Sequence, residues 1–242
     1  MRPRASPSLL LRCRLSPGDI VMLTAAVRDL HRAHPGAFRT DVRTTARELW
    51  AHNPHLTPLQ QDDPAVRQLQ MHYPLIHRSN EAACHFIHGF HQDLEAKLGV
   101  TIPVSEFRGD VHLAEEEKAW MSQVQETGRQ GPFWILIAGG KADATTKWPD
   151  PAVLQRVVDH LRDRILFVQC GSAEHWHPPL EGVVNLVGRT DLRQFVRLMY
   201  HAQGVVCPVT FAMHLAAAGF TADRVQPQGR TGGVDMTGGG AL

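Results

Sequence analysis

The sequence predicts an α/β protein made of two Rossmann-like halves, each with a mainly parallel sheet. Short apolar runs alternate with amphipathic stretches of helical period along most of the 242 residues, and strands that alternate with helices favour a doubly wound parallel sheet. The alternation starts again after a turn-rich segment at 128–132, which predicts the boundary between the halves. A hydrophobic content of 43% with 20% charged residues suffices for one large or two small domains and excludes a disordered or collagen-like chain.

In the first half, the apolar run at 9–15 predicts a buried strand, and the helical spacing that follows over 20–34 ends at Pro35-Gly36. The remaining elements expected here are strands at 38–42 and 66–73, a short helix at 45–51 and a helical stretch at 114–124. The longest helix is expected over 80–98, capped by Ser79 or Asn80 and stopped by Gly99.

In the second half, the nearly continuous apolar run at 133–138 predicts a strand that is covered on both faces. Further strands are expected at 165–169, 183–187 and 205–207, and helices at 151–164, 192–201 and 211–218. From 219 to 242 the chain holds seven glycines and no periodic apolar pattern, so this segment is expected to be a disordered or aberrant tail. The predicted domains therefore span 1–128 and 129–218, the second of them incomplete.

The net charge, the cysteines and the lengths of the apolar runs exclude several classes of protein. Twenty-five Lys and Arg residues against 24 Asp and Glu give a formal charge of +1, which supplies no basic field for nucleic acid. Four scattered cysteines without a CxxC pair argue against a disulfide framework or a structural zinc site, and favour a cytoplasmic protein. The basic start could mimic a signal peptide, but Arg12 and Arg14 interrupt its apolar run. No apolar run approaches the roughly 18–20 residues needed to span a bilayer.

Two loops that follow predicted strands in the two halves carry residues suited to chemistry. In Ser16-Pro17-Gly18-Asp19, Gly18 allows close backbone approach, and Asp19 is either a helix cap or a general base aimed into a cleft. The stretch 139–148 holds two lysines and two threonines, so it is either an exposed polar loop or a site for an anionic diphosphate. Gly140, Lys141 and Thr146 join Gly18 as candidate phosphate-loop residues.

Two later loops of the second half offer further polar groups at the same edge of its sheet. Glu174, in the loop 169–174, is placed either in solvent or where it accepts hydrogen bonds from ribose hydroxyls. At 207–218 a strand runs into a helix of small residues, whose N-terminal amides favour a phosphate. The alanines of that helix are equally suited to close packing on the sheet.

These loops occur in an order that resembles glycosyltransferase family 9, the heptosyltransferase-like enzymes with the two-domain GT-B fold. The resemblance covers about residues 9–218. It rests on an ordered set of short motifs: Gly18-Asp19, Lys147-Trp148-Pro149, Gly171-Ser172-Ala173-Glu174, Asn185-Leu186-Val187-Gly188 and Met213-His214-Leu215-Ala216-Ala217. The fold class that the resemblance implies is GT-B, with an N-terminal acceptor-side domain and a C-terminal domain that binds the nucleotide sugar.

The resemblance also implies a reaction and residue roles. It implies inverting transfer from a nucleotide-diphosphate sugar, typically ADP-heptose, without a cofactor or an essential metal. Asp19 matches the family's base, Lys147 the lysine that neutralises the leaving diphosphate, and Glu174 the ribose-binding acid. Gly188, Thr210 and His214 match further donor-binding positions. The implied partners are the sugar donor and an acceptor glycan or protein hydroxyl, as in lipopolysaccharide biosynthesis, with peripheral membrane association possible for such an acceptor.

The sequence departs from the family pattern in two places. Val209, Thr210 and Phe211 stand where the family has Asp-Thr/Ser-Gly, so a sugar-contacting carboxylate is replaced. The chain also stops earlier than family members do, which predicts a truncated or frame-shifted terminus. These departures keep an alternative open: a catalytically inactive GT-B-like remnant that binds a nucleotide or a protein partner.

Several histidines and tryptophans lie outside these motifs. His85, His88 and His91 share one predicted helix, but their spacing rotates the third off the face of a metal site, so partly buried or surface histidines are expected. His175 and His177 could line the nucleotide pocket. The apolar neighbours of Trp50, Trp120 and Trp134 predict core positions.

Overall fold

A computed structural model describes residues 6–75, 78, 81, 84–120, 123–142 and 147–220. Its first half is a parallel three-stranded sheet in the order β2-β1-β3. The strands are β1 (Ser8–Cys13), β2 (Arg39–Thr44) and β3 (Val66–Gln70), and the helices are α1 (Pro17–Ala33), the 3-10 helix η1 (Arg47–Trp50) and α2 (His88–Leu98). Leu10, at the centre of β1, lies opposite Asp41 and Gln68.

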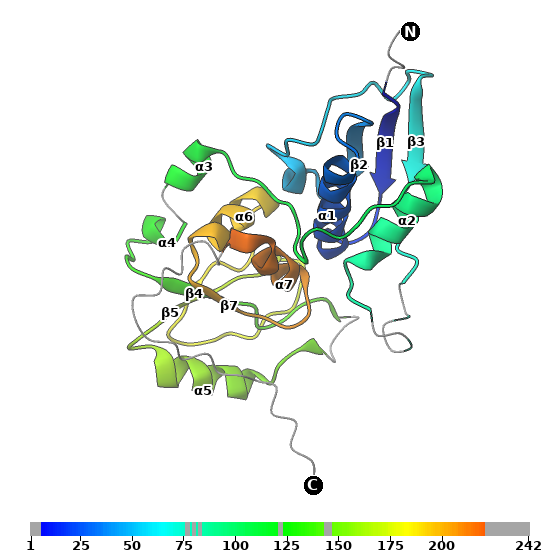
Figure 1. The fold of residues 1–242 in the computed structure, drawn as a ribbon. Coiled ribbons are helices and arrows are strands. Elements are labelled where there is room, and N and C mark those ends of the chain that lie inside the picture. The colour runs from blue at the N-terminus through cyan, green and yellow to red at the C-terminus, as the bar shows by residue number, and fades with distance from the viewer. Residues whose placement is uncertain are drawn as a thin grey trace.

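The second half is a parallel four-stranded sheet in the order β6-β5-β4-β7 (Figure 1). Its strands are β4 (Phe133–Leu136), β5 (Leu166–Gln169), β6 (Val184–Asn185) and β7 (Gly204–Val206). Its helices are α5 (Pro151–Leu161), α6 (Leu192–His201) and α7 (Phe211–Leu215), which continues as the π-helix η3 (Ala216–Phe220). The predicted α/β class with two mainly parallel sheets is therefore confirmed.

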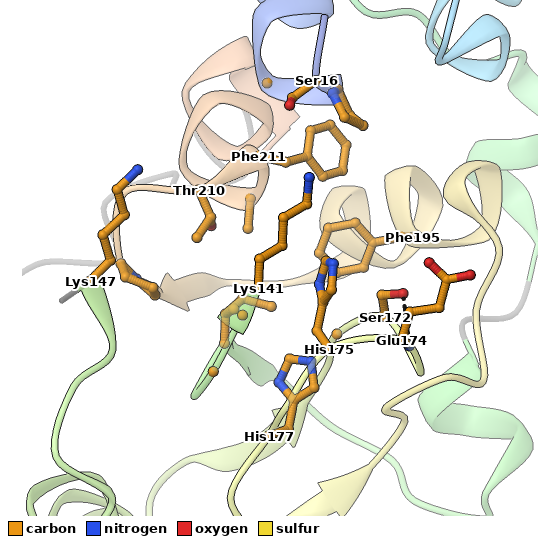
Figure 2. A pocket seen from close by; sticks show the side chains of 18 of the residues that line it. Ser16, Lys141, Lys147, Ser172, Glu174, His175, His177, Phe195, Thr210 and Phe211 are labelled. Atoms are coloured by element: carbon orange, nitrogen blue, oxygen red, sulfur yellow. Dashed lines mark hydrogen bonds between the residues drawn. The ribbon is translucent and has the colours of Figure 1, made fainter. Parts of the chain in front are cut away.

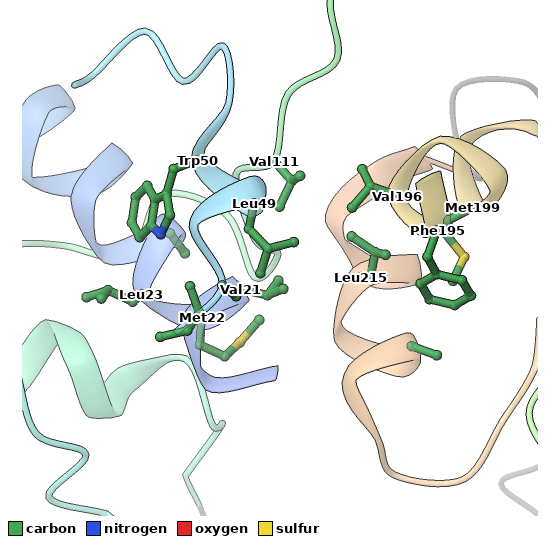
Figure 3. Close-up of a cluster of buried hydrophobic side chains, with 14 of the residues drawn as sticks. Val21, Met22, Leu23, Leu49, Trp50, Val111, Phe195, Val196, Met199 and Leu215 are labelled. Atoms are coloured by element: carbon green, nitrogen blue, oxygen red, sulfur yellow. The ribbon is translucent and has the colours of Figure 1, made fainter. Parts of the chain in front are cut away.

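Helix α1 lies where the two halves meet. Pro17 stands at its first turn, and a capping box joins Ser16 and Asp19. Nearly every residue from Gly18 to Leu30 is buried, because α1 packs against α2 and η1 of the first half and against α7 of the second. One apolar cluster consequently runs through both halves, with Val21, Met22 and Leu49 on one side of the junction and Val196 and Leu215 on the other (Figure 3).

Buried charges hold the connecting segment against α1. The Arg28 guanidinium pairs with Asp29 (Nε–Oδ1 2.8 Å) and donates to the carbonyls of Glu106 and Arg108. Asp29 also accepts from the Ser105 N–H and hydroxyl, and it bonds to His91 Nε2 at 2.8 Å. Because these bonds satisfy both buried charges, the segment 105–108 is fixed along the helix.

A second clamp links elements of both halves. Arg193, on α6, makes an ion pair with Glu117 and donates to the carbonyls of His112 and Glu48. Glu48 belongs to η1 of the first half, so one guanidinium ties α6 to both the connecting segment and the first domain. The geometry of the junction is thus held by directed bonds as well as by apolar packing.

Three expectations about residues 80–124 were wrong: the start of one helix, the continuity of the next helix, and the burial of Trp120. The helix expected over 80–98 begins at His88; Ser79 and Asn80, its expected caps, lie outside the described residues. The segment before it is held in turns, because the Tyr73 hydroxyl donates to the Phe86 carbonyl and the Ile87 N–H donates to His85 Nδ1.

The helix expected over 114–124 is two short helices, α3 (Glu115–Ala119) and α4 (Gln123–Glu126), because the backbone is extended at Trp120. Trp120 is 51% exposed and is not a core residue. The Arg197 guanidinium covers its ring, 3.2 Å from the centroid, and this contact accounts for an indole outside the core. Trp50 is buried as expected, and Trp134 is half-buried.

The C-terminal helix begins at Phe211 as expected, and its helical backbone ends before Gly219, whose φ of 99° is not helical. The rest of the expected tail, 221–242, lies outside the described residues. Across the described part of the chain, no helix is both long and apolar enough to cross a bilayer.

Candidate functional site

A pocket of about 860 Å³ opens between the start of α1 and the carboxyl ends of the strands of the second sheet. In open α/β sheets this edge is where ligands bind, because the loops that leave the strands converge there. The lining comes from the loops after β1, β4, β5, β6 and β7, from the N-terminal parts of α1, α6 and α7, and from Phe86 of the segment before α2. Figure 2 shows how side chains from these loops point into a common space.

Asp19 combines both roles that the sequence left open. Its carboxylate accepts a hydrogen bond from the Ser16 N–H (3.1 Å), so it caps α1. It also lines the pocket, and burial raises its pKa above the ordinary aspartate value. A half-buried carboxylate with a raised pKa is a stronger proton acceptor than one in water.

The loop after β4 is folded tightly against the loop after β5. The Gly140 N–H donates to the Trp176 carbonyl (3.0 Å), and the rings of Trp148 and Trp176 stack with centroids 4.6 Å apart. A Cβ on Gly139 would lie 2.0 Å from the Trp176 carbonyl oxygen, so only glycine fits there. This packing presents Lys141 and Lys147 at the pocket; Thr146, the other predicted residue of the loop, lies outside the described residues.

The loop after β5 supplies several polar side chains to the pocket. Glu174 is exposed, and its N–H donates to the Ser172 hydroxyl (3.3 Å), which places both side chains on one side of the pocket in Figure 2. His175 and His177 line the same pocket. Burial lowers the pKa of His177, and neither ring nitrogen has a hydrogen-bond partner among the described residues.

Gly188 joins the loops after β5 and β6. Its φ is +69°, and its N–H donates to the Gly171 carbonyl at 2.8 Å. An added Cβ would lie 2.8 Å from the Cβ of Ala173. A larger residue would therefore strain the turn and separate two loops that line the pocket.

Helix α7, which follows the loop after β7, brings the second half against the start of α1. An added Cβ on Gly18 would lie 3.0 Å from His214 Cδ2, so glycine permits the close approach of the two halves. Burial, and the nearby His85, lower the pKa of His214. The Thr210 hydroxyl, also at the pocket, is buried and has no hydrogen-bond partner in the part of the chain that the structure describes.

The structure thus places every described residue of the predicted site at one pocket, while their roles stay predictions. Sequence reasoning missed Phe86, Asp191 and Phe195. The local sequence does not indicate that Phe86 and Phe195 line a pocket, because apolar side chains in a pocket and in the core occur in the same sequence patterns. Asp191 could have been found from its place as the cap of α6, just after the Gly188 turn.

The histidines of the α2 region are used differently. His91 is buried against Asp29, whereas His85 and His88 lie edge-on to the ring of Phe107. Within the described ranges, no group of three or more His, Cys, Asp or Glu side chains is arranged to hold a metal ion.

Comparison with known proteins adds a family model and several solved structures. Residues 110–221 match the model of glycosyltransferase family 9 (heptosyltransferase). The chain is similar to the structure of E. coli ADP-heptose lps heptosyltransferase II, with 17% identity, a TM-score of 0.58, and coverage of 87% of this chain and 82% of that one. No curated protein sequence matches the chain.

Two further structures share this architecture. The glycosyl transferase of family 9 from Veillonella parvula DSM 2008 has 14% identity and a TM-score of 0.65, over 88% of this chain and 78% of that one. E. coli heptosyltransferase WaaC with ADP has 16% identity and a TM-score of 0.56, over 87% and 84%. These similarities agree with the GT-B fold expected from the motifs.

Proposed function

We propose, from the premise that this chain carries a glycosyltransferase family 9 domain over residues 110–221, that it transfers a heptose-type sugar from ADP-heptose to a hydroxyl acceptor with inversion. The observation that carries the proposal is a single pocket that joins Asp19 of the first half to the loops of the second sheet. An inverting transferase needs this arrangement, because the base and the leaving group must lie on opposite sides of the anomeric carbon.

The donor is assigned to the second half. Glu174 accepts hydrogen bonds from the ribose hydroxyls, and the Gly188 turn shapes the adjoining wall. The diphosphate lies across the loop of Gly140, Lys141 and Lys147 toward Thr210, with His214 beside it and Gly18 across the junction. Thr210 supports this assignment, because a buried hydroxyl without a partner can donate to a phosphate oxygen without losing another bond.

The reaction then needs one proton transfer and one displacement. The acceptor oxygen attacks the anomeric carbon while Asp19 takes the hydroxyl proton. The bond from the anomeric carbon to the diphosphate oxygen breaks, and ADP leaves with the electron pair. Cationic and hydroxyl donors at the diphosphate stabilise the charge that develops on it. The proposed acceptor is a glycan or protein hydroxyl, and the proposed location is the cytoplasm.

Ligand binding and transfer test this function separately. ADP in hundredfold excess over its Kd should stabilise the protein by about 2.7 kcal/mol, and we expect smaller thermal shifts with UDP and GDP. Mass spectrometry of glycan and protein acceptors after incubation with ADP-heptose should then detect a heptose adduct. ADP binding without transfer to any acceptor would contradict the proposed activity and identify a nucleotide-binding remnant, for which Val209 and Phe211 provide a reason.

Replacing Lys147 with alanine tests the diphosphate assignment. We expect the Kd of ADP to rise about threefold, a modest effect because this amine stands at the edge of the pocket, where solvent screens its charge, while the Kd of adenosine stays unchanged. Isothermal titration with both ligands measures the difference. An equal loss for adenosine and ADP would show that Lys147 does not act on the phosphates.

A further inference from the structure

The two lysines of the loop after β4 approach the pocket in different ways. The side chain of Lys141 extends through the middle of the pocket in Figure 2, between Thr210 and Phe195, with its amine toward the ring of Phe211. Lys147 stands at the edge of the pocket, on the other side of Thr210. The two amines therefore belong to different parts of the same site.

The order of the other polar groups identifies which part a diphosphate would occupy. Ser172 and Glu174 lie on one side of the pocket, and Ser16, which is hydrogen-bonded to Asp19, lies at the start of α1. A nucleotide sugar whose ribose meets Glu174 and whose sugar meets Asp19 must carry its diphosphate through the space between them. In Figure 2, Lys141 lies on the side of the pocket that holds Glu174 and Ser16, whereas Lys147 lies beyond Thr210.

Two hydrogen-bond donors of this pocket, one of them positively charged, lack an acceptor among the described residues, and such donors suit an anion. The Lys141 amine makes no ion pair or hydrogen bond with any residue that the structure describes. The Thr210 hydroxyl, which lies between the two lysines in Figure 2, is buried and likewise lacks a partner within those ranges. Both groups donate hydrogen bonds, and a phosphate oxygen accepts from both without breaking an existing contact.

We propose that Lys141 carries the larger share of the positive charge that binds the donor diphosphate and stabilises it as it leaves. The proposal rests on the proposed function, because it takes a nucleoside diphosphate to be the ligand. As the bond between the anomeric carbon and the diphosphate oxygen breaks, negative charge grows on that oxygen. The Lys141 ammonium offsets this charge while its proton stays on the nitrogen.

Matched substitutions distinguish the two lysines. Lys141→Met and Lys147→Met each remove one charge but keep most of the apolar stem, and Lys118→Met is the control because Lys118 pairs with Glu115 away from the pocket. Titration calorimetry should give a rise of about tenfold or more in the Kd of ADP for Lys141→Met, the size expected for a charged hydrogen bond. We expect about threefold for Lys147→Met and no change for Lys118→Met. The Kd of adenosine should be unchanged in all three.

The outcomes separate this proposal from the one it rests on. Lys141→Arg should recover most of the ADP affinity that Lys141→Met loses. If Lys147→Met weakens ADP as much as Lys141→Met, or if Lys141→Met weakens adenosine equally, the role of Lys141 is wrong although the protein still binds its donor nucleotide. If the unaltered protein binds none of ADP, UDP and GDP, the proposed function fails and this proposal fails with it.

Discussion

Replacing Asp19 with asparagine should lower the rate of sugar transfer by roughly 10²–10⁴-fold, the usual contribution of a positioned general base. The amide oxygen of asparagine can still accept the Ser16 N–H, so α1 keeps its cap and the fold should survive. The amide cannot take a proton from the acceptor hydroxyl. The measurement is kcat with ADP-heptose as donor, together with the melting temperature of both proteins.

The control for this variant is Asp150→Asn. Asp150 caps α5 by accepting the Ala152 N–H at 2.8 Å, and it does not line the pocket. This second substitution should change neither rate nor stability by much. A transfer rate of Asp19→Asn within a few-fold of the unaltered enzyme would mean that Asp19 is only a cap.

The fall of kcat/KM at low pH provides a further test of Asp19 as the general base. Because burial raises the pKa of this carboxyl, the value of kcat/KM should begin to fall at a higher pH than the ordinary aspartate pKa of about 3.9. The fall occurs as pH decreases, since the protonated form cannot act as a base. A profile that is flat down to the ordinary aspartate range would exclude Asp19 as the base.

The largest effect on stability is expected from Asp29→Asn. The side chains of Asp29, Arg28 and His91 are 0%, 2% and 3% exposed, so the guanidinium would remain buried with its charge uncompensated. Removing one partner of a buried ion pair costs about 3–5 kcal/mol. Urea unfolding measures the loss, and Asp62→Asn, at an exposed position, is the matched control. A loss under about 1 kcal/mol would be the size of a surface pair and would contradict the role assigned to this network.

The same network predicts how stability depends on pH. Burial opposes ionisation of Asp29, but the hydrogen bonds from His91, Arg28 and Ser105 outweigh it and hold the pKa well below its usual range. A depressed pKa means that the ionised carboxylate stabilises the folded state above the unfolded value of about 3.9 and loses this contribution as pH falls further. Asp29→Asn should therefore flatten the acid limb of the stability curve. Glu106 and Glu117, whose pKa values are also lowered, keep contributing in both proteins.

Most of the secondary structure was predictable from local patterns. The α6 bounds were predicted as the structure has them, and β3, β4 and β5 lie within their expected ranges, whereas β1 begins one residue before its expected start. The expected start of α2 was wrong because Tyr73, distant in the sequence, holds the segment before His88 in turns. The expected helix at 114–124 was wrong because the backbone is extended at Trp120, where the ring packs under Arg197 of α6. Neither contact has a signature in the segment that it changes.

The sequence by itself determined the alternation of strands and helices and the polar loops at the strand ends, because hydrophobic period and turn chemistry act between near neighbours. Only the tertiary structure decided that α1 is buried between the halves, that Gly18 meets His214, and that Lys141 rather than Lys147 extends into the centre of the pocket. These features depend on the packing of segments far apart in the chain, and the direction of a side chain is settled only when its distant neighbours are in place.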